Sequence, residues 1–264
     1  MTNPRITIVT TSFNSEATVE ETILSVISQD YDNLEYVIID GMSTDNTLDI
    51  VHKYHDKIDV ILSEKDRGIS DAFNKGIDKA TGDIICFINS DDHLLPGVLK
   101  KVAKEYDGKA DVYCGNVLLW NPENGFKCRE VPSVKFPTTP FFCHVAHQGM
   151  FATKECYERF GAYDVNLRFP MDLDFLIRVS KGGGIFHYMD IDIAEFRSGG
   201  NTGSFSITEK KKDYLYMVRK NGGTSLQAYL FYYYLFGTQL VKKILSIFGM
   251  NFVQRLRYRE ISNS

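Results

Sequence analysis

The sequence predicts an α/β fold with a mostly parallel central sheet flanked by helices. Short apolar runs alternate with amphipathic segments four times within about the first 90 residues, as is typical of a doubly wound parallel sheet. The run at 84–88 is almost continuously apolar, as expected of a strand buried on both faces. Polar residues follow the ends of successive strands, where ligands bind in open α/β sheets.

The strands of the first half are predicted from apolar runs that end in polar groups, at 5–10, 34–40, 58–63 and 84–88. The helices between them are predicted from apolar residues at helical spacing, such as Val19, Ile23 and Val26. These helices cover 15–29, a short segment around 48–54, and a segment that starts at Ser70. Each short crossover between these strands should be right-handed.

The second half is expected to add a helix at 96–106, a strand at 111–120 and a loop-rich stretch at 121–140 with four of the seven prolines. Ordered structure resumes at 147–151, and a short helix covers 154–160. A further helix within 169–181 is predicted because Phe175, Leu176 and Val179 are apolar, and the glycines at 182–184 end it. A strand at 185–189 and a loop at 196–200 follow.

The tail differs in character from the rest of the chain. Helices are predicted at 207–220 and 225–248, and residues 229–236 are unusually aromatic. Lys242 and Lys243 interrupt the apolar run, which therefore falls short of the roughly 20 residues of a membrane span. Two alternatives stay open: the segment 225–259 lies on a membrane surface, or it packs on the body or on a second subunit of a homo-oligomer. We expect a main domain at 1–206, divided into the parts 1–93 and 94–206, and a basic, aromatic helical tail at 207–264.

Composition limits the compartment and the partners. The five cysteines are odd in number and lack a C-x-x-C spacing, which favours a reducing, cytoplasmic location, and the amino terminus shows no signal-peptide pattern. From residue 207 onward, 10 Lys and Arg stand against 3 Asp and Glu, while residues 1–206 carry 20 against 31. An acidic body argues against nucleic-acid binding. A basic tail suits anionic lipid or a lipid diphosphate.

Two adjacent acids, Asp91 and Asp92, follow the buried run at 84–88. Carboxylates this close repel one another, and a hard divalent cation bound to a phosphate ligand relieves the repulsion. The alternative is a solvated turn in which one of the acids caps the next helix. Neither a G-x-G-x-x-G nor a G-x-x-x-x-G-K-[ST] motif follows a strand, which argues against dinucleotide-binding and P-loop folds.

In this order and spacing, several motifs together resemble the family 2 glycosyltransferases, whose nucleotide-sugar-binding fold is called GT-A. The motifs are TTSFN, EYVIIDGMSTDNT, EKDRGISDAFNKG, ATGDIICFINSDD, HQGMF and PMDLDFLIR. The resemblance covers residues 5 to about 200. It implies that the main domain at 1–206 is catalytic, with a nucleotide-binding half at 1–93 and an acceptor-binding half at 94–206. EKDRGISDAFNKG is especially similar to bacterial enzymes that build O-antigen or capsule repeat units.

The resemblance implies nucleotide-sugar-binding roles for Thr11, Phe13, Asn14, Asp40, Asp71, Asp91 and Arg197. Phe13 offers a face on which a base stacks, unless it is a core aromatic. Asp40 is expected to accept the imide N–H of uracil, which favours a UDP-sugar. Asp71 has the alternative of a surface acid one turn from Lys75. Arg197 either reaches the diphosphate or forms a structural ion pair.

The resemblance also implies a metal site and a catalytic base. Asp92 is expected to bind Mn²⁺ or Mg²⁺ directly, with Asp91 on the ribose or on a metal-bound water, while His93 is expected to start a helix. Asp172 is the expected base, although Met171 stands where the family usually has Glu. The remaining candidates are Asp174, as a rival base, and His147 and Gln148 on the acceptor or sugar side. A zinc site at His144 and His147 lacks four clustered ligands.

The function implied is an inverting, metal-dependent glycosyltransferase that uses a nucleotide-sugar in surface polysaccharide synthesis. The expected acceptor is a glycan linked to a lipid diphosphate, reached at the inner face of the plasma membrane. One alternative is a nucleotidyltransferase, but TTSFN lacks the glycine-rich basic loop that those enzymes carry. The other is a non-catalytic, nucleotide-binding scaffold subunit.

Overall fold

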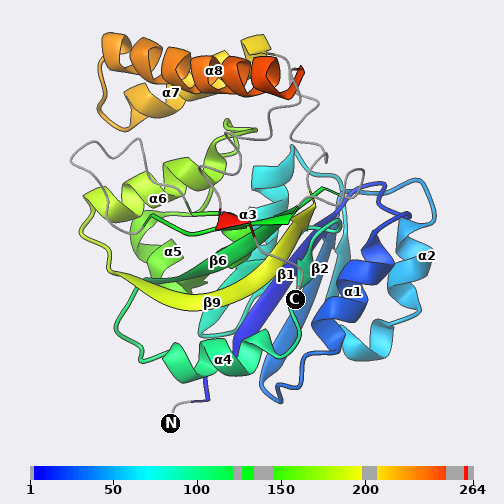
Figure 1. Cartoon of the computed structure of the whole chain (residues 1–264). Helices are drawn as coiled ribbons and strands as arrows, with labels where there is room; N and C mark the ends of the chain where they lie inside the picture. Colours follow the sequence, from blue (N-terminus) through cyan, green and yellow to red (C-terminus); the bar gives the residue numbers. More distant parts are fainter. Residues whose placement is uncertain (1–2, 122–126, 134–144, 198–206, 248–258, 261–264) are drawn as a thin grey trace.

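The computed structural model describes residues 3–121, 127–133, 145–197, 207–247 and 259–260. Within these ranges ten strands form one sheet, in the order β10-β7-β6-β8-β4-β1-β2-β3, with β5 and β9 paired off this path. Helices cover both faces of the sheet, and a further pair of helices lies at the top of the view in Figure 1. The predicted α/β class with a helix-flanked central sheet is confirmed.

Four neighbouring strands make the parallel half of the sheet: β1 (Ile6–Ser12), β2 (Leu34–Asp40), β3 (Val60–Ser63) and β4 (Ile84–Phe87). Their register sets Ser12 beside Asp40, and Asp40 beside Ser63. The connecting helices are α1 (Val19–Ile27), α2 (Thr47–His52), the short η1 (His55–Lys57) and α3 (Ile69–Lys79). The loops that carry the predicted nucleotide motifs therefore leave the sheet at a common edge.

The other half makes the sheet mixed rather than mostly parallel. β8 (Met150–Thr153) runs antiparallel between β4 and β6 (Val112–Trp120), and β9 (Phe186–Arg197) runs parallel to β6. The remaining strands are β5 (His93–Leu94), β7 (Lys127–Glu130) and β10 (Arg259–Glu260), all in antiparallel pairs. The predicted strand at 185–189 thus continues to Arg197, and His93 belongs to a strand, not to the start of a helix.

Alternating side chains of β1 enter two cores on opposite faces of the sheet. Ile8 packs in one core with Ile23 of α1 and with α4 (Val98–Glu105). Val9 packs in the other with Phe73 of α3, α5 (Lys154–Phe160) and α6 (Met171–Lys181). The face that holds α3 therefore also holds α6, whose first turn carries Asp172.

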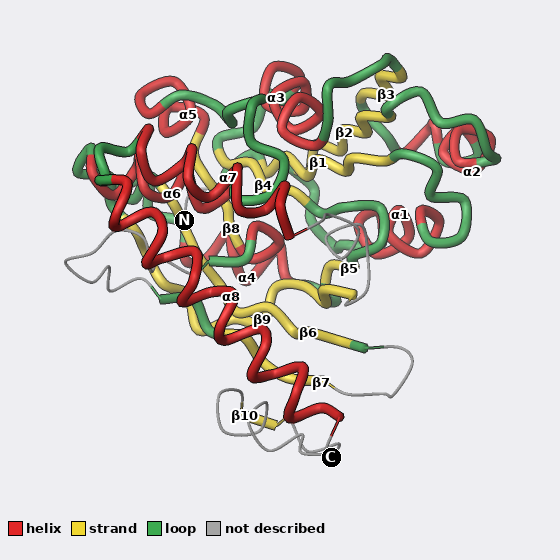
Figure 2. Tube along the Cα trace, turned by 90° about the horizontal axis from the view of Figure 1, so that it is seen from above, coloured by secondary structure: helices red, strands yellow, loops and turns green. Residues whose placement is uncertain are grey.

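The tail forms a helical hairpin, α7 (Ile207–Lys220) and α8 (Ser225–Ile247), which lies above α6 in Figure 1. Met217, Val218, Ala228 and Phe231 join the core that contains α6. In Figure 2, α8 runs on past the body toward β7 and β10. Among the described residues, no helix combines the length and apolar character needed to cross a bilayer.

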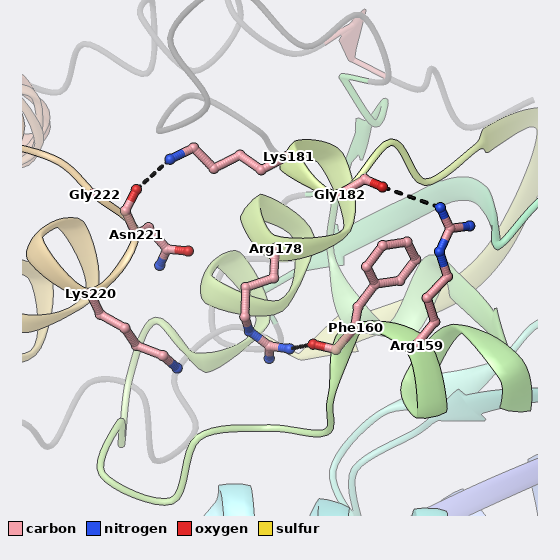
Figure 3. A pocket seen from close by; sticks show the side chains of 8 residues that line it. All are labelled: Arg159, Phe160, Arg178, Lys181, Gly182, Lys220, Asn221 and Gly222. Atoms are coloured by element: carbon pink, nitrogen blue, oxygen red, sulfur yellow. Dashed lines mark hydrogen bonds between the residues drawn. The ribbon is translucent and has the colours of Figure 1, made fainter.

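An open hollow between α5, α6 and the end of α7 contains four cationic side chains (Figure 3). Lys181 Nζ donates to the carbonyl of Asn221, Arg159 to that of Gly182 at 3.2 Å, and Arg178 to that of Phe160. Cations stabilise the last carbonyls of helices, where the helix dipole is negative. These side chains therefore tie three helix ends together.

Candidate active site

Phe13 lies exposed in the loop after β1, with 55% of its surface accessible. An added Cβ at Gly41 would lie 2.6 Å from Asp66 Oδ2 and 3.3 Å from the Phe13 ring, so the Asp66 carboxylate would have to move to admit a side chain there. The exposure excludes the alternative that Phe13 is a core aromatic. An exposed ring supported by a backbone segment is a suitable stacking surface, and stacking on a base stays a prediction.

Asp40 has no exposed surface and binds groups from three strand ends. Its carboxylate accepts from Ser12 Oγ at 3.2 Å, from Ser63 Oγ at 2.8 Å, and from both the backbone N (2.9 Å) and the hydroxyl of Ser43. A carboxylate has about four lone-pair positions, and all four are used. Asp40 thus organises the loops here. The predicted contact with uracil would require one of these bonds to open.

Asn14 and Asp71 also fix loops at this edge. Asn14 has a left-handed backbone (φ 49°); its N–H donates to Ser43 Oγ, and its side-chain oxygen accepts from Thr44 N, both at 2.8 Å. Asp71 accepts from the Arg67 guanidinium at 2.8 Å and from its backbone N at 3.1 Å. These bonds and the positive charge of Arg67 lower the pKa of Asp71. Nucleotide contacts by Asn14 and Asp71 stay predictions.

The two acids after β4 have different surroundings from those expected. Asp92 is fully buried and accepts from Gln148 Nε2 at 2.8 Å and from the backbone N of Arg197 at 3.2 Å. Burial, and then the charge of Asp91, raise the pKa of Asp92 to about 7. Asp91 is partly exposed, and burial raises its pKa as well. The geometry therefore favours Asp91, and not Asp92, as the acid that can meet a ligand directly.

A divalent cation fits this position only with help from the substrate. Among the described residues, no three His, Cys, Asp or Glu side chains cluster closely enough to hold a metal ion. Mg²⁺ and similar ions are commonly held by one or two carboxylates together with substrate phosphates and water. A cation at Asp91 would also offset the repulsion that raises the pKa of Asp92. The oxygen ligand present fits such a nucleotide-bound ion.

Arg197 forms the structural ion pair that was one of its two predicted roles. Its Nη2 donates to Glu21 Oε2 at 2.9 Å, and its guanidinium lies 5.1 Å from the centroid of the Trp120 ring. Its Nε is buried and makes no hydrogen bond in the structure. Its positive charge offsets part of the rise that burial causes in the pKa of the nearby Asp91. A contact between Arg197 and a diphosphate stays a prediction.

Asp172 lies in the first turn of α6, and side chains of α3 hold the loop that precedes this helix. Ser70 Oγ donates to the carbonyl of Leu167 at 2.6 Å, and the Asn74 side chain bonds both backbone groups of Tyr163 at 2.8 Å. The Asp172 side chain is 32% exposed, and its Oδ2 lies 3.9 Å from His147 Nδ1. It is thus accessible, as a general base requires.

Asp174 is not on the acceptor side. It is fully buried and accepts from Arg178 Nε at 3.0 Å, Lys220 Nζ at 3.0 Å and Asn221 Nδ2 at 2.8 Å. Residues two apart on a helix point about 200° away from each other. Asp174 therefore faces α7, and its burial and its three partners argue against the predicted role as a rival base.

The segment His147–Gly149 forms a 3-10 turn (η3) that leads into β8. His147 Nε2 lies 3.0 Å from Asn89 Nδ2, which brings the turn to the end of β4. The Gln148 side chain is buried and donates to Asp92. It therefore holds the acid pair in place and does not line the sugar side. Sequence reasoning missed Asn89, whose signal was its place directly after the buried run. His144 lies outside the described residues.

Comparison with known proteins gives a consistent result. Residues 7–152 match the model of glycosyl transferase family 2. Over 219 residues, the chain is 28% identical to a PGL/p-HBAD biosynthesis glycosyltransferase of Mycobacterium tuberculosis, covering 80% of this chain and 83% of that protein. Over 121 residues it is 32% identical to the GalNAc(5)-diNAcBac-PP-undecaprenol beta-1,3-glucosyltransferase of Campylobacter jejuni, covering 44% of this chain and 39% of that protein.

The fold is similar to that of S. aureus TarS residues 1–349, crystallised with UDP-GlcNAc. The TM-score is 0.66 at 20% sequence identity, and the match covers 81% of this chain and 65% of the TarS fragment. At this identity the likeness concerns the fold alone. It includes the mixed sheet with its helices on both faces.

Proposed function

Because the chain belongs to glycosyl transferase family 2 and has the GT-A fold, we propose that it transfers a sugar from a nucleotide-sugar to a hydroxyl group of a glycan acceptor. The observation that carries this proposal is the accessible Asp172 beside His147, which Asn89 links to the acid pair after β4. The proposed base and the proposed diphosphate-side acid, Asp91, would then both lie near the carboxyl end of β4. That arrangement suits a direct displacement at the anomeric carbon.

In the proposed reaction, Phe13 stacks on the base of the donor, and Asp91 lies at the diphosphate. Asp172 takes the proton of the acceptor hydroxyl as its oxygen forms a bond to the anomeric carbon. The bond from that carbon to the diphosphate oxygen breaks, and the nucleotide diphosphate leaves with the electron pair. One in-line displacement inverts the anomeric centre. A bound Mn²⁺ or Mg²⁺ would stabilise the charge of the leaving diphosphate.

We assign uridine as the donor base, and a lipid-diphosphate-linked glycan as the acceptor. TarS, which has the same fold, was crystallised with UDP-GlcNAc. The name of the Campylobacter jejuni relative describes a glucosyltransferase acting on a PP-undecaprenol-linked glycan. Both observations concern other proteins, and they support this choice of substrate class for synthesis of a surface polysaccharide.

The tail offers a surface for such a lipid acceptor. One side of α8 is exposed and apolar or aromatic at spacings of three and four residues, and we call it the aromatic stripe: Leu226, Tyr229, Leu230, Tyr233 and Tyr234. Lys211 Nζ lies 5.3 Å from the centroid of the Tyr229 ring, and the tail carries an excess of basic residues. Exposed aromatics beside lysines favour binding at an anionic membrane surface. We propose that α8 docks there, at the cytoplasmic face.

The test combines binding and transfer. Wild type and Asp172→Asn are titrated with UDP, GDP, CDP and TDP, with and without Mn²⁺, and are then assayed with UDP-sugars on a lipid-diphosphate-linked glycan. We expect both proteins to bind UDP and only the wild type to transfer sugar with inversion. Binding without transfer by the wild type on any acceptor would instead favour the scaffold function. Preference for GDP would overturn the assignment of uridine.

A further inference from the structure

His147 lies between Asn89 at the end of β4 and Asp172 at the start of α6. Its Nε2 is 3.0 Å from Asn89 Nδ2, and its Nδ1 is 3.9 Å from Asp172 Oδ2. The ring packs edge-on against Phe73, with centroids 5.6 Å apart and planes inclined by 71°. The side chain is only 15% exposed. Asn89 and Phe73 therefore hold the imidazole ring in place, and its Nδ1 faces Asp172, the proposed base.

The hydrogen bonds determine which ring nitrogen carries the proton. Asn89 Oδ1 accepts from Thr11 Oγ1 at 3.1 Å, so the amide NH₂ faces the imidazole. An NH₂ group donates and does not accept. His147 Nε2 must therefore be the unprotonated nitrogen, since an N–H there would point at another N–H. A neutral ring then has its proton on Nδ1, directed at Asp172.

We propose that His147 is a positioning residue for Asp172, held by Asn89 in the Nδ1–H tautomer. This inference rests on the proposed function, because it gives His147 its task in the proton transfer to Asp172. The Leu173 backbone N already donates to Asp172 Oδ1 at 2.8 Å. Closure of the 3.9 Å gap to His147 when the acceptor docks fixes the second oxygen, so that a free lone pair of the carboxylate meets the acceptor hydroxyl.

The proton balance leaves His147 unchanged. The acceptor oxygen bonds to the anomeric carbon, its proton moves to the Asp172 carboxylate, and the nucleotide diphosphate departs. His147 keeps its Nδ1 proton throughout and acts only through Asp172. Phe73, which stacks on Phe87 at 4.0 Å, and Asn89 keep the ring from turning.

The first test reads the tautomer and needs no substrate. Nitrogen chemical shifts of the imidazoles are recorded for wild type and Asn89→Asp, and His147→Gln identifies the signals of His147 among the six histidines. We expect Nδ1–H in the wild type. In Asn89→Asp an acceptor faces the ring, so the proton should move to Nε2. An Nε2–H tautomer in the wild type would overturn the proposal, whatever the enzyme's substrate is.

The second test asks whether the position of the N–H group at residue 147 matters, or only the size of the side chain. Asn at residue 147 places an amide N–H where Nδ1 lies, whereas Gln places it near Nε2. We expect His147→Gln to lower kcat about 100-fold with an unchanged KM for the donor, and His147→Asn to retain most of kcat. In an Asp172→Asn background, His147→Gln should lower the residual rate no further.

The two hypotheses fail in different ways. Equal kcat in wild type and His147→Gln, or equal losses in the Gln and Asn variants, would overturn the positioning role while leaving the glycosyltransferase intact. Absence of transfer by the wild type would overturn the proposed reaction, while the imidazole shifts would still decide the tautomer. Urea unfolding of each variant checks that the fold persists.

Discussion

Gln148 Nε2 donates to Asp92 Oδ2 over 2.8 Å, and both side chains are almost wholly buried. The acid pair is thus divided into a structural member, Asp92, which joins β4 to the turn before β8 and to the end of β9, and an accessible member, Asp91. A buried carboxylate that keeps hydrogen bonds but has no cationic partner is expensive to ionise. This division has consequences that can be measured.

The first prediction concerns stability and pH. The pKa of Asp92 is about 7 in the folded protein, against about 3.9 when unfolded. Between these values the native state holds a proton that the unfolded state has lost, so the free energy of unfolding falls as pH rises through this window. With EDTA present, the urea midpoint of the wild type should therefore fall more between about pH 5 and pH 8 than that of Asp92→Asn. The same pH dependence in both proteins would contradict the assignment.

The second prediction separates the two acids by metal dependence. Asp91→Asn removes the accessible carboxylate, so Mn²⁺ should no longer raise the affinity for UDP. Asp92→Asn keeps Asp91 and should retain part of the Mn²⁺ effect. Calorimetric titration of UDP with and without Mn²⁺ measures both. A larger loss in Asp92→Asn would restore the assignment expected from the motif alone.

The third prediction tests the exposed ring after β1. Stacking of a base on an aromatic side chain contributes about 1–3 kcal/mol, so Phe13→Ala should weaken UDP binding by about 10-fold or more, while Phe13→Tyr should bind normally. Because Phe13 is exposed, its loss should leave the urea midpoint nearly unchanged. Met42→Ala, at another exposed apolar side chain, is the matched control. Equal affinity in Phe13→Ala and wild type would rule out stacking.

The fourth prediction distinguishes Asp174 from a catalytic acid. Removal of one partner from a buried ion pair leaves the other charge uncompensated, so Asp174→Ala should lower the free energy of unfolding by about 3 kcal/mol. At a temperature where the variant is folded, its kcat should stay close to the wild-type value. Urea unfolding and transfer assays are compared with those of Asp172→Asn, for which we expect the reverse. Loss of transfer with normal stability would return Asp174 to the reaction.

The fifth prediction concerns the aromatic stripe. Leu230→Glu and Tyr233→Glu place a charge on α8 at exposed positions, so binding to vesicles that contain anionic lipid should weaken markedly. Leu24→Glu, on α1 and also exposed, should bind as the wild type does. Flotation with anionic and with neutral vesicles at two salt concentrations provides the measurement. Equal flotation of all four proteins would exclude this surface as the docking site.

Local pattern was sufficient for the parallel half and for the position of Asp172. Residues 34–40 form the strand predicted from LEYVIID, and 154–160 and 207–220 form the predicted helices. β9 continues past Met189 as far as Arg197, where β6 still pairs with it. The residues from Asp190 to Ile193 alternate in polarity, which is the local signal of a half-buried strand. The prediction that ended this strand at Met189 therefore overlooked a signal that the segment carries.

Long-range contacts explain why the surroundings of Asp92 and Asp174 differ from those expected. Asp92 and Gln148 are 56 positions apart, and Asp92 and Arg197 are 105 apart. Asp174 finds Lys220 and Asn221 46 and 47 positions later. The motifs located the acids correctly at the end of β4 and at the start of α6. Which of these acids is buried depends on contacts between distant segments, and only the folded chain brings those segments together.

The contact of Asp174 with the end of α7 limits how parts of related enzymes can be exchanged. A chimaera that joins residues 1–206 to a foreign tail keeps Asp174 but loses its partners Lys220 and Asn221. Asp174 would then lack these two partners in the same helical turn that bears Asp172. Successful grafts should therefore include equivalents of Lys220 and Asn221, even when the new tail is chosen only for its lipid preference. Compatibility of the tail is thus a property of α6 as much as of the tail itself.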